Sequence, residues 1–308
     1  MAPPPALAAV RRSLLRWYAR YGRTSLPWRT VRTPYVTAVS EFMLVQTQVE
    51  RVIPKVEAFV ARFPDFATLA RASTAEVVRA WKGLGYNARA VRLQRLAQIV
   101  TERYGGALPS DATELRSLPG LGPYGVAAIR SFAFNLDDAP VDTNVRRIVH
   151  RLFWGIEHGG SVSARELNER AHELVPRGRS HDWNSALMDL GTAICTSRAP
   201  KCPICPLRVQ CVAAPIEPAA LEAARKAQPR RAHRDAPPYP QSRRRARGRI
   251  VDRLRDLPPG RRISLLDLHR FIDLEVPGRT IDEVRELVGA LERDGLVIRD
   301  GELVALRE

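Results

Sequence analysis

The sequence feature that most constrains the fold is the short stretch Leu118-Pro-Gly-Leu-Gly122. The residues before it, 111–117, predict a helix whose N-cap is Ser110 or Asp111. The residues after it, 123–134, predict a second helix that starts with proline, where a missing N–H costs nothing. Two glycines spaced i, i+2 permit positive φ and leave backbone amides uncovered. The stretch therefore predicts a helix-hairpin-helix motif, with a tight turn between two packed helices as the simpler alternative.

The hairpin of this motif, Gly120, Leu121 and Gly122, offers free amides beside the start of a helix, which together form an anion site. The chain carries a net charge of +16, which indicates a polyanionic partner. We therefore expect the hairpin to bind phosphates of a nucleic acid.

The four cysteines form the second strong signal. They fall within 17 residues, with the spacing C-x6-C-x2-C-x5-C, and they are Cys195, Cys202, Cys205 and Cys211. Two disulfides would rarely crowd into so short a stretch, and a reducing compartment disfavours them. Four thiolates around one centre fit either zinc or an iron–sulfur cluster, and the spacing alone does not separate the two.

The chain before about residue 215 shows almost no alternation of period two, so this part is predicted to be all-α. Residues 213–248, rich in proline, alanine and arginine, predict a basic linker. Residues 249–308 predict three helices and two strands around Asp300-Gly301, a sequence typical of a hairpin turn. This pattern is typical of a winged-helix-like α+β module, which can bind DNA or protein.

The first ten residues contain three prolines and no apolar stretch of signal-peptide length. No run of about 18 apolar residues occurs, so no membrane helix is predicted. We expect a cytoplasmic, nucleoid-associated monomer without a membrane partner.

The chain resembles the helix-hairpin-helix DNA glycosylases that carry an iron–sulfur cluster, and among them it is most similar to the MutY adenine glycosylases. The resemblance covers about residues 14–212. It rests on the cysteine run and on six motifs: Leu26-Pro-Trp-Arg29, Ser40-Glu-Phe-Met-Leu-Val-Gln-Thr-Gln-Val49, Gly83-Leu-Gly-Tyr86, Leu118-Pro-Gly-Leu-Gly-Pro-Tyr124, Val141-Asp-Thr-Asn-Val145 and Ala186-Leu-Met-Asp-Leu-Gly191.

The resemblance implies a [4Fe-4S] cluster on the four cysteines. It also implies two lobes, with residues 1–30 and 140–212 forming the cluster-bearing lobe and residues 31–139 forming a helical barrel that contains the hairpin motif. Its implied activity is removal of adenine mispaired with 8-oxoguanine or guanine in DNA.

Two acids suit the breaking of a purine N-glycosidic bond, which needs a proton donor by the base and an anion by the sugar. Glu41 lies in an apolar predicted helix, where desolvation should raise its pKa. Asp142 stands at a predicted N-cap, where backbone N–H groups should keep it ionised. The resemblance implies that Glu41 protonates adenine N7 and that Asp142 stabilises the oxocarbenium ion. The simpler alternatives are a buried structural carboxylate and an ordinary helix cap.

Tyr124 stands where bifunctional endonuclease III enzymes place a Schiff-base lysine. Tyrosine cannot form a Schiff base, and none of the four lysines of the chain lies in the hairpin. We therefore expect hydrolysis without an efficient lyase step, with Tyr124 helping to hold the sugar and Asp142.

Access to a base inside duplex DNA requires flipping it out and filling the gap. The resemblance implies that Gln46 and Tyr86 intercalate and that Asn144 orders Asp142 or contacts the sugar-phosphate backbone. It assigns the base pocket to four residues, namely Trp28, Arg29, Leu44 and Val49.

The sequence departs from the family at Val45-Gln46, where Gln-Gln is usual, and at Thr143, where Gly is frequent. The last 60 residues are too short for the nudix-like domain that checks 8-oxoguanine, and the short form resembles actinobacterial members. Two alternatives stay open: a thymine/uracil mismatch glycosylase, and a non-catalytic DNA-binding or redox-sensing iron–sulfur protein.

Overall fold

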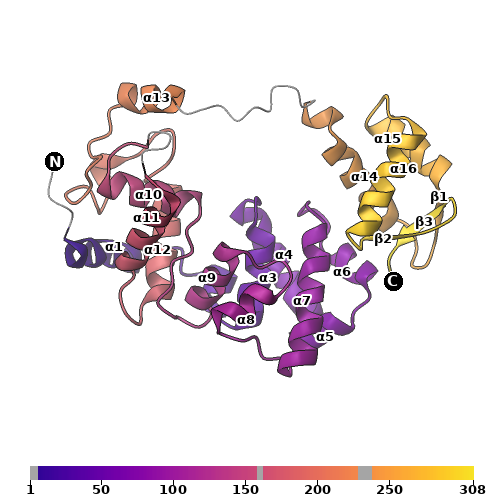
Figure 1. The fold of residues 1–308 in the computed structure, drawn as a ribbon, viewed down its shortest axis with the longest axis horizontal. Coiled ribbons are helices and arrows are strands. Elements are labelled where there is room, and N and C mark those ends of the chain that lie inside the picture. Colours follow the sequence, from indigo (N-terminus) through magenta and orange to yellow (C-terminus); the bar gives the residue numbers. More distant parts are fainter. Residues whose placement is uncertain (1–5, 158–161, 228–237) are drawn as a thin grey trace. The chain divides into compact units, whose positions relative to one another are not determined.

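The computed structural model describes residues 6–157, 162–227 and 238–308, which are mostly helical with one small sheet (Figure 1). No helix among these described residues is both long and apolar enough to cross a membrane. The chain divides into two compact units. The first unit comprises Met1–Thr37, Ser110–Ser117 and Leu121–Arg231. The second unit comprises Ala38–Pro109, Leu118–Gly120 and Ala232–Glu308.

The first unit is built from helices alone within its described residues. They are α1 (Leu7–Tyr21), α2 (Pro27–Thr30), α8 (Ala112–Ser117), α9 (Pro123–Phe132), α10 (Thr143–Phe153), α11 (Ala164–Leu174), α12 (Ser180–Ala193), the 3-10 helix η1 (Cys202–Ile204) and α13 (Pro218–Ala227). Helix α12 packs against α1, α9 and α10, while α11 packs against α1 and α10. Their apolar faces meet in one core, which includes the fully buried Leu14, Val149 and Trp183. This core fixes the start of α10, where Asp142 lies.

The second unit combines a helical part with the C-terminal module. Its elements are α4 (Val49–Arg62), α5 (Phe66–Arg71), α6 (Thr74–Ala80), α7 (Ala88–Tyr104), the 3-10 helix η2 (Tyr239–Gln241), α14 (Arg243–Arg255), β1 (Ile263–Ser264), α15 (Leu265–Glu275), α16 (Ile281–Arg293), β2 (Val297–Asp300) and β3 (Leu303–Leu306). Helix α3 (Pro34–Leu44) begins in the first unit and ends in the second. Helix α7 packs against α5 and α6, and α14 packs against α15, α16 and α6.

Local sequence explains where several helices begin. Ser73 and Glu76 form a capping box at the start of α6, and Thr280 and Glu283 form another at the start of α16. The predicted cap of α8 is confirmed for Asp111, whose Oδ1 accepts hydrogen bonds from the backbone N–H groups of Thr113 (2.8 Å) and Glu114 (2.9 Å).

The sheet has the strand order β1-β3-β2, and both pairings are antiparallel. The predicted hairpin is present, with Val297 opposite Leu306 and with Gly301 at φ +58° in the turn. Strand β1 was not predicted from the sequence, because two residues are too few to show alternation.

The segment expected as a linker, residues 213–248, is more ordered in its described part than its composition suggests. It contains α13, η2 and the start of α14, and its residues 228–237 lie outside the described residues. Helix α14 begins at Arg243 rather than at the expected residue 249, because the Ser242 hydroxyl caps it by accepting from the N–H of Arg245 (3.2 Å). The module it leads into groups with residues 38–109.

Candidate active site

The hairpin stretch predicted from the sequence contains two glycines with different conformations. Gly120 has φ +87°, and a Cβ built there would lie 2.7 Å from the ring of Phe42. Gly122 instead is extended (φ −87°, ψ −176°) and forms the N-cap position of α9, with open space around it. The positive φ that glycine permits is therefore adopted at Gly120 and not at Gly122, since the N-cap position of a helix takes extended backbone.

Leu121 is 7% exposed, so its side chain belongs to the core rather than to a ligand-binding surface. Tyr124 is the second residue of α9 and is half-buried.

Asp142 lies at the start of α10 and is the N-cap, as predicted. Its Oδ1 accepts hydrogen bonds from the backbone N–H groups of Asn144 (2.8 Å) and Val145 (2.7 Å), and its Oδ2 accepts one from the side-chain amide of Asn144 (2.8 Å). Three donors therefore fix the orientation of a half-buried carboxylate. The predicted role of Asn144 in ordering Asp142 agrees with this geometry.

A chain of hydrogen bonds connects this carboxylate to the cysteine segment. The Arg147 guanidinium donates through Nη2 to Asn144 Oδ1 (2.8 Å) and to the Gly191 carbonyl (2.8 Å), and through Nε to the Cys195 carbonyl (2.7 Å). Gly191 must be glycine, because a Cβ there would lie 2.7 Å from Cβ of Asn144. Sequence reasoning missed Arg147, although its position one helical turn after Asn144 was a usable signal.

The four cysteines line one cavity, together with Arg151 and apolar side chains that include Ile194 and Ile216. They form no disulfide. Burial raises the pKa of Cys205 to about 12 and that of Cys211 to about 11. Because all four thiols line the same cavity, they can together bind a group that needs four thiolate ligands.

Arg151 is 1% exposed and contacts the same cysteine segment. Its guanidinium donates to Cys195 Sγ (3.5 Å) and to the Thr196 carbonyl (2.8 Å), and it pairs with Glu157 (2.9 Å). Burial alone would lower the pKa of Arg151, but the charges and hydrogen bonds of Cys195 and Glu157 raise it above its usual range. No local pattern marked this residue, which is one of three arginines in α10.

The described residues contain no group of three or more His, Cys, Asp or Glu side chains arranged to hold a single metal ion. Zinc would need its four sulfurs about 2.3 Å from one point. The cysteines thus share a cavity without converging on one ion.

Arg29 was predicted in the base pocket, and its guanidinium is buried and hydrogen-bonded through both Nη atoms. It forms a bidentate ion pair with Asp189 (2.7 and 3.1 Å) and donates to the carbonyls of Arg23 (3.2 Å) and Ser185 (3.3 Å). Burial would raise the pKa of Asp189, but the hydrogen bonds and charge of Arg29 and Arg23 hold it below its usual range. Trp28, beside it on α2, is half-buried.

The residues predicted from the second motif lie on α3, on α4 and on the turn that joins them. Glu41 and Leu44 on α3 and Val49 at the start of α4 are half-buried, and Gln46 on the turn is exposed. Gln46 has φ +54°, in the left-handed region that a glutamine rarely occupies.

Tyr86 also has a left-handed backbone, with φ +44°, and its side chain is 39% exposed. One side chain, Arg89, contacts both unusual segments. It donates to the carbonyls of Phe42 (2.6 Å), Met43 (3.0 Å), Val45 (2.9 Å), Leu84 (3.0 Å) and Gly85 (3.2 Å). One buried arginine, Arg89, therefore hydrogen-bonds to the segments of both predicted intercalating residues. This arginine was not identified from the sequence.

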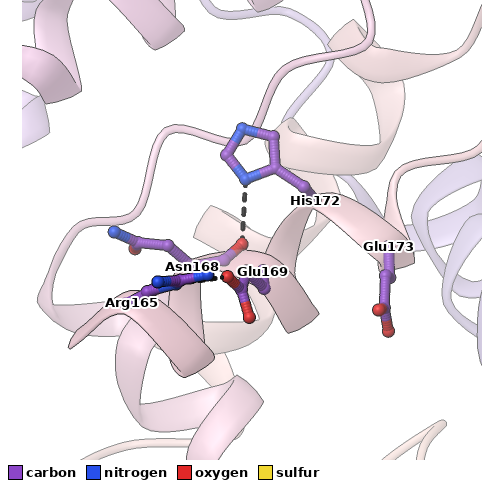
Figure 2. Close-up of a pocket in the computed structure, with 5 residues that line it drawn as sticks. All are labelled: Arg165, Asn168, Glu169, His172 and Glu173. Carbon is purple, nitrogen blue, oxygen red and sulfur yellow. Dashed lines mark hydrogen bonds and ion pairs between the residues drawn. The ribbon is translucent and has the colours of Figure 1, made fainter. Parts of the chain in front are cut away.

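A shallow hollow on α11 lies apart from the predicted residues in the first unit (Figure 2). It is lined by Arg165, Asn168, Glu169, His172 and Glu173, none of which the sequence assigned to a site. The ring of His172 bonds to the Asn168 carbonyl (2.8 Å) and to Asp138 (2.9 Å). The contact with Asp138 raises the pKa of His172.

Comparison with known proteins places these features in a family. Residues 39–177 match the family described as HhH-GPD superfamily base excision DNA repair protein. The adenine DNA glycosylase of Mycolicibacterium smegmatis is 43% identical over 198 residues, which are 63% of this chain and 66% of that enzyme. The enzyme of the same name from Mycobacterium tuberculosis is 39% identical over 211 residues, 67% of this chain and 69% of that enzyme.

The adenine DNA glycosylase of Buchnera aphidicola (subsp. Baizongia pistaciae) is 37% identical over 199 residues, 65% of this chain, and the match spans only 56% of its own length. Among solved structures, a thermostable thymine-DNA glycosylase is 30% identical with a TM-score of 0.61, covering 67% of this chain and 95% of that protein. An endonuclease III–DNA complex shares the fold at 22% identity and a TM-score of 0.56, over 67% of this chain and 96% of that one.

Proposed function

Since this chain belongs to the HhH-GPD superfamily of base excision DNA repair proteins, we propose that it is a monofunctional DNA glycosylase that removes adenine mispaired with 8-oxoguanine or guanine. The observation that carries this proposal is the carboxylate of Asp142, which three N–H donors hold in one orientation at the start of α10. An anion held in this way needs no reorganisation when a positive sugar forms beside it.

In the proposed reaction, Glu41 donates a proton to N7 of adenine, so that the base leaves as a neutral molecule when the bond from C1′ to N9 breaks. Asp142 stabilises the positive charge that develops on the sugar. A water molecule then attacks C1′ and releases a proton to solvent, which yields an abasic site and free adenine, and the Glu41 carboxylate takes up a proton from solvent to restore the acid. Tyr124 cannot form a Schiff base, so the strand stays intact.

Adenine is favoured over other bases by two observations. Enzymes named adenine DNA glycosylase match about two thirds of this chain at 37–43% identity. Glu41 lies half-buried on α3, where a carboxylic acid can serve as proton donor to a purine leaving group.

A thymine or uracil mismatch glycosylase is the second candidate. It is favoured by the 30% identity to a thymine-DNA glycosylase, 95% of which this chain covers. Tyr124 fits either candidate and therefore does not decide the base.

We also propose that Cys195, Cys202, Cys205 and Cys211 hold a [4Fe-4S] cluster. Each cysteine of such a cluster binds a different iron, so the four sulfurs need a shared cavity rather than a common point. The lining of one cavity by all four thiols supports a four-thiolate site, and the family resemblance favours the cluster over zinc. When bound, the cluster would cross-link the segment around Cys195 and fix its position. Arg147 connects this segment to Asp142 through Asn144.

For the C-terminal module, we propose a winged-helix-like fold. Its order of three helices with the antiparallel sheet β1-β3-β2 supports this, and the Asp300-Gly301 turn would form the tip of the wing.

The activity is tested by single-turnover release of the base from duplexes carrying A:8-oxoG, A:G, T:G or U:G. We expect release from the two adenine duplexes, and a loss of about 10²–10⁴ in rate for Glu41→Gln, since a positioned general acid contributes about that factor. Asp142→Asn should lose a similar factor, because removal of one preorganised electrostatic group costs about 10²–10³.

Two matched controls separate chemistry from structure. Asp65→Asn alters another aspartate N-cap, which accepts from the N–H of Thr68 at the start of α5, and Glu50→Gln alters an exposed acid on α4. Both should keep the rate within about twofold, as expected for surface changes. Release from T:G alone would move the assignment to the second candidate, and binding without any base release would favour a non-catalytic protein.

A further inference from the structure

The C-terminal module docks beside the Tyr86 segment through one end of α14. Arg255 is 7% exposed, and its guanidinium donates to the Val78 carbonyl (2.8 Å) and to Asn87 Oδ1 (2.7 Å). Next to it, Lys82 pairs with Asp256 (2.8 Å). Asn87 directly follows Tyr86 in the chain, so these contacts fix α14 against the segment that carries the exposed tyrosine.

The other end of α14 reaches the ring of Tyr86 itself. The guanidinium of Arg244 lies 4.0 Å from the centroid of the Tyr86 ring and 5.6 Å from that of Tyr239. Tyr239 is 61% exposed and Arg244 is exposed. An arginine stacked on an aromatic ring keeps its N–H donors at the edge of the guanidinium, where they can still bind a phosphate.

Arg244 differs from most other arginines of α14 in its charge environment. Arg243 pairs with Glu286, Arg247 with Asp294, Arg249 with Glu275 and Arg255 with Asp252. Within residues 6–157, 162–227 and 238–308, no carboxylate lies within ion-pair distance of Arg244, and its guanidinium contacts two aromatic rings. Its positive charge is therefore available to an anion that approaches Tyr86.

We propose that Arg244 is a DNA-contacting residue that holds the Tyr86 ring for insertion into the duplex and binds the adjacent phosphate, which makes the C-terminal module part of the DNA-binding surface of the second unit. The proposal rests on DNA being the partner of the chain, as the proposed function requires, and on the predicted insertion of Tyr86 into the duplex. It does not depend on which base is removed.

Arg89 explains why the ring needs support from α14. The backbone of Tyr86 is strained at φ +44°, and Arg89 holds it through carbonyls of neighbouring residues rather than through the phenol. The guanidinium of Arg89 lies 5.5 Å from the Tyr86 ring, farther than that of Arg244. Arg89 therefore fixes the backbone of the segment, and Arg244 fixes the direction of the ring.

The test compares Arg244→Ala, Arg244→Lys and Arg243→Ala in the full chain. Arg243 is the matched control, because it is the neighbouring exposed arginine of the same helix and its charge is already paired with Glu286. Binding is measured by fluorescence anisotropy at several salt concentrations, on an undamaged duplex and on one with a non-cleavable abasic analogue.

We expect Arg244→Ala to weaken binding about fivefold to tenfold and to reduce the slope of log K against log salt by about 1, the loss of one phosphate contact. Arg244→Lys should keep the slope and lose about half of the affinity that Arg244 adds relative to alanine. The reason is that an ammonium group carries the charge but has no plane to stack on the ring. Arg243→Ala should stay within about twofold of wild type with an unchanged slope.

A double variant tests whether Arg244 acts through Tyr86. The combined effect of Arg244→Ala and Tyr86→Ala on affinity should be smaller than the product of the two single effects, since residues in contact are not additive. Fully multiplicative effects, or a slope for Arg244→Ala equal to that of wild type, would overturn the proposal. A lowered Tm with an unchanged slope would show that Arg244 only clamps the module.

The outcomes separate this proposal from the proposed function. If the chain releases no adenine but Arg244→Ala still lowers the salt slope, the assigned reaction is wrong and the DNA surface stands. If adenine is released normally and the slope does not change, only the role of Arg244 is wrong. If wild-type protein does not bind duplex DNA, both fail.

Discussion

Among the buried arginines of the two units, Arg151 in the first and Arg89 in the second each lie beside a predicted functional segment, and the two are held in opposite ways. In the first unit, Arg151 lies against Cys195 and pairs with Glu157, and its pKa is raised. In the second unit, Arg89 binds backbone carbonyls, and no carboxylate in the described part of the chain pairs with it; burial lowers its pKa to about 10.

The difference shows what each arginine does. A buried charge that is paired with an opposite charge adds little net stability, because the cost of desolvation offsets the attraction. Its role is to hold a segment in register. A buried charge without an opposite partner lowers the stability of the fold. It persists where its hydrogen bonds hold a backbone conformation that would otherwise relax. Arg89 therefore maintains the strained Gln46 and Tyr86 segments, while Arg151 orders the cysteine segment.

The largest expected effect comes from replacing Arg89, the buried arginine without a carboxylate partner. Arg89→Met should lower the free energy of unfolding by about 3 kcal/mol, because several buried carbonyls lose their donor at about 1 kcal/mol each. Urea unfolding of the full chain measures it. Arg95→Met, an exposed change on the same helix, is the control and should cost less than about 0.5 kcal/mol. Equal effects of the two changes would contradict the role assigned to Arg89.

A glycine of the second unit with a left-handed backbone, Gly120, sharpens the comparison when it is set beside its extended neighbour Gly122. Gly120→Ala should cost about 2 kcal/mol, since alanine disfavours φ +87° and its Cβ would meet the Phe42 ring at 2.7 Å. Gly122→Ala has extended backbone and open space, and should cost under about 0.5 kcal/mol. Thermal unfolding of both variants checks the pair, and a reversed order would refute the geometry of the hairpin.

Replacing the compensated arginine should cost less than replacing Arg89. Arg151→Met should lower the free energy of unfolding by about 1.5 kcal/mol, because methionine retains part of the packing and Glu157, 23% exposed, can turn to water. The iron content of the purified variant should also fall if the [4Fe-4S] proposal holds. Arg146→Met, exposed on the same helix, should change neither. A cost equal to that of Arg89→Met would remove the distinction drawn between the two units.

The smallest effect concerns an ion pair of the first unit that depends on pH. His172 hydrogen-bonds to Asp138, which raises the pKa of His172; despite the cost of burial, that contact and Arg130 lower the pKa of Asp138. A raised histidine pKa contributes stability that is fully present below about pH 6.5 and is lost as pH rises through the folded-state pKa.

His172→Gln should therefore destabilise the chain at about pH 5.5 and leave it unchanged at about pH 9. The side chain is 48% exposed, so solvent screening keeps the effect under about 1 kcal/mol. Chemical unfolding at the two pH values measures it, with His269→Gln in the C-terminal module as control. An effect that grows toward high pH would contradict the assignment.

Much of the fold followed from local sequence. The glycines around residue 120, the proline at 123 and the acid at 111 are local signals, and they predicted α8, the turn and α9 with small boundary errors. Asp142 was predicted as an N-cap for the same reason, because capping depends on residues within one turn. The mostly helical fold and the C-terminal hairpin were confirmed.

Contacts between distant segments could not be predicted in the same way. Nothing in the pattern around Arg89 shows that it would bind carbonyls of residues 42–45, more than forty positions earlier. The ion pair between Arg29 and Asp189, 160 positions later, could not be predicted either, and the place of Arg29 in the base pocket stays a prediction. The role of Glu41 as proton donor stays a prediction.

The sequence by itself determined the helices, their caps, the hairpin and the group of four cysteines, because each depends on residues that are close along the chain. Tertiary structure alone decided which charges are buried, which are paired, and that α14 lies against the segment carrying Tyr86. These outcomes depend on desolvation and on hydrogen bonds between residues far apart in sequence, and neither quantity exists until the chain has folded.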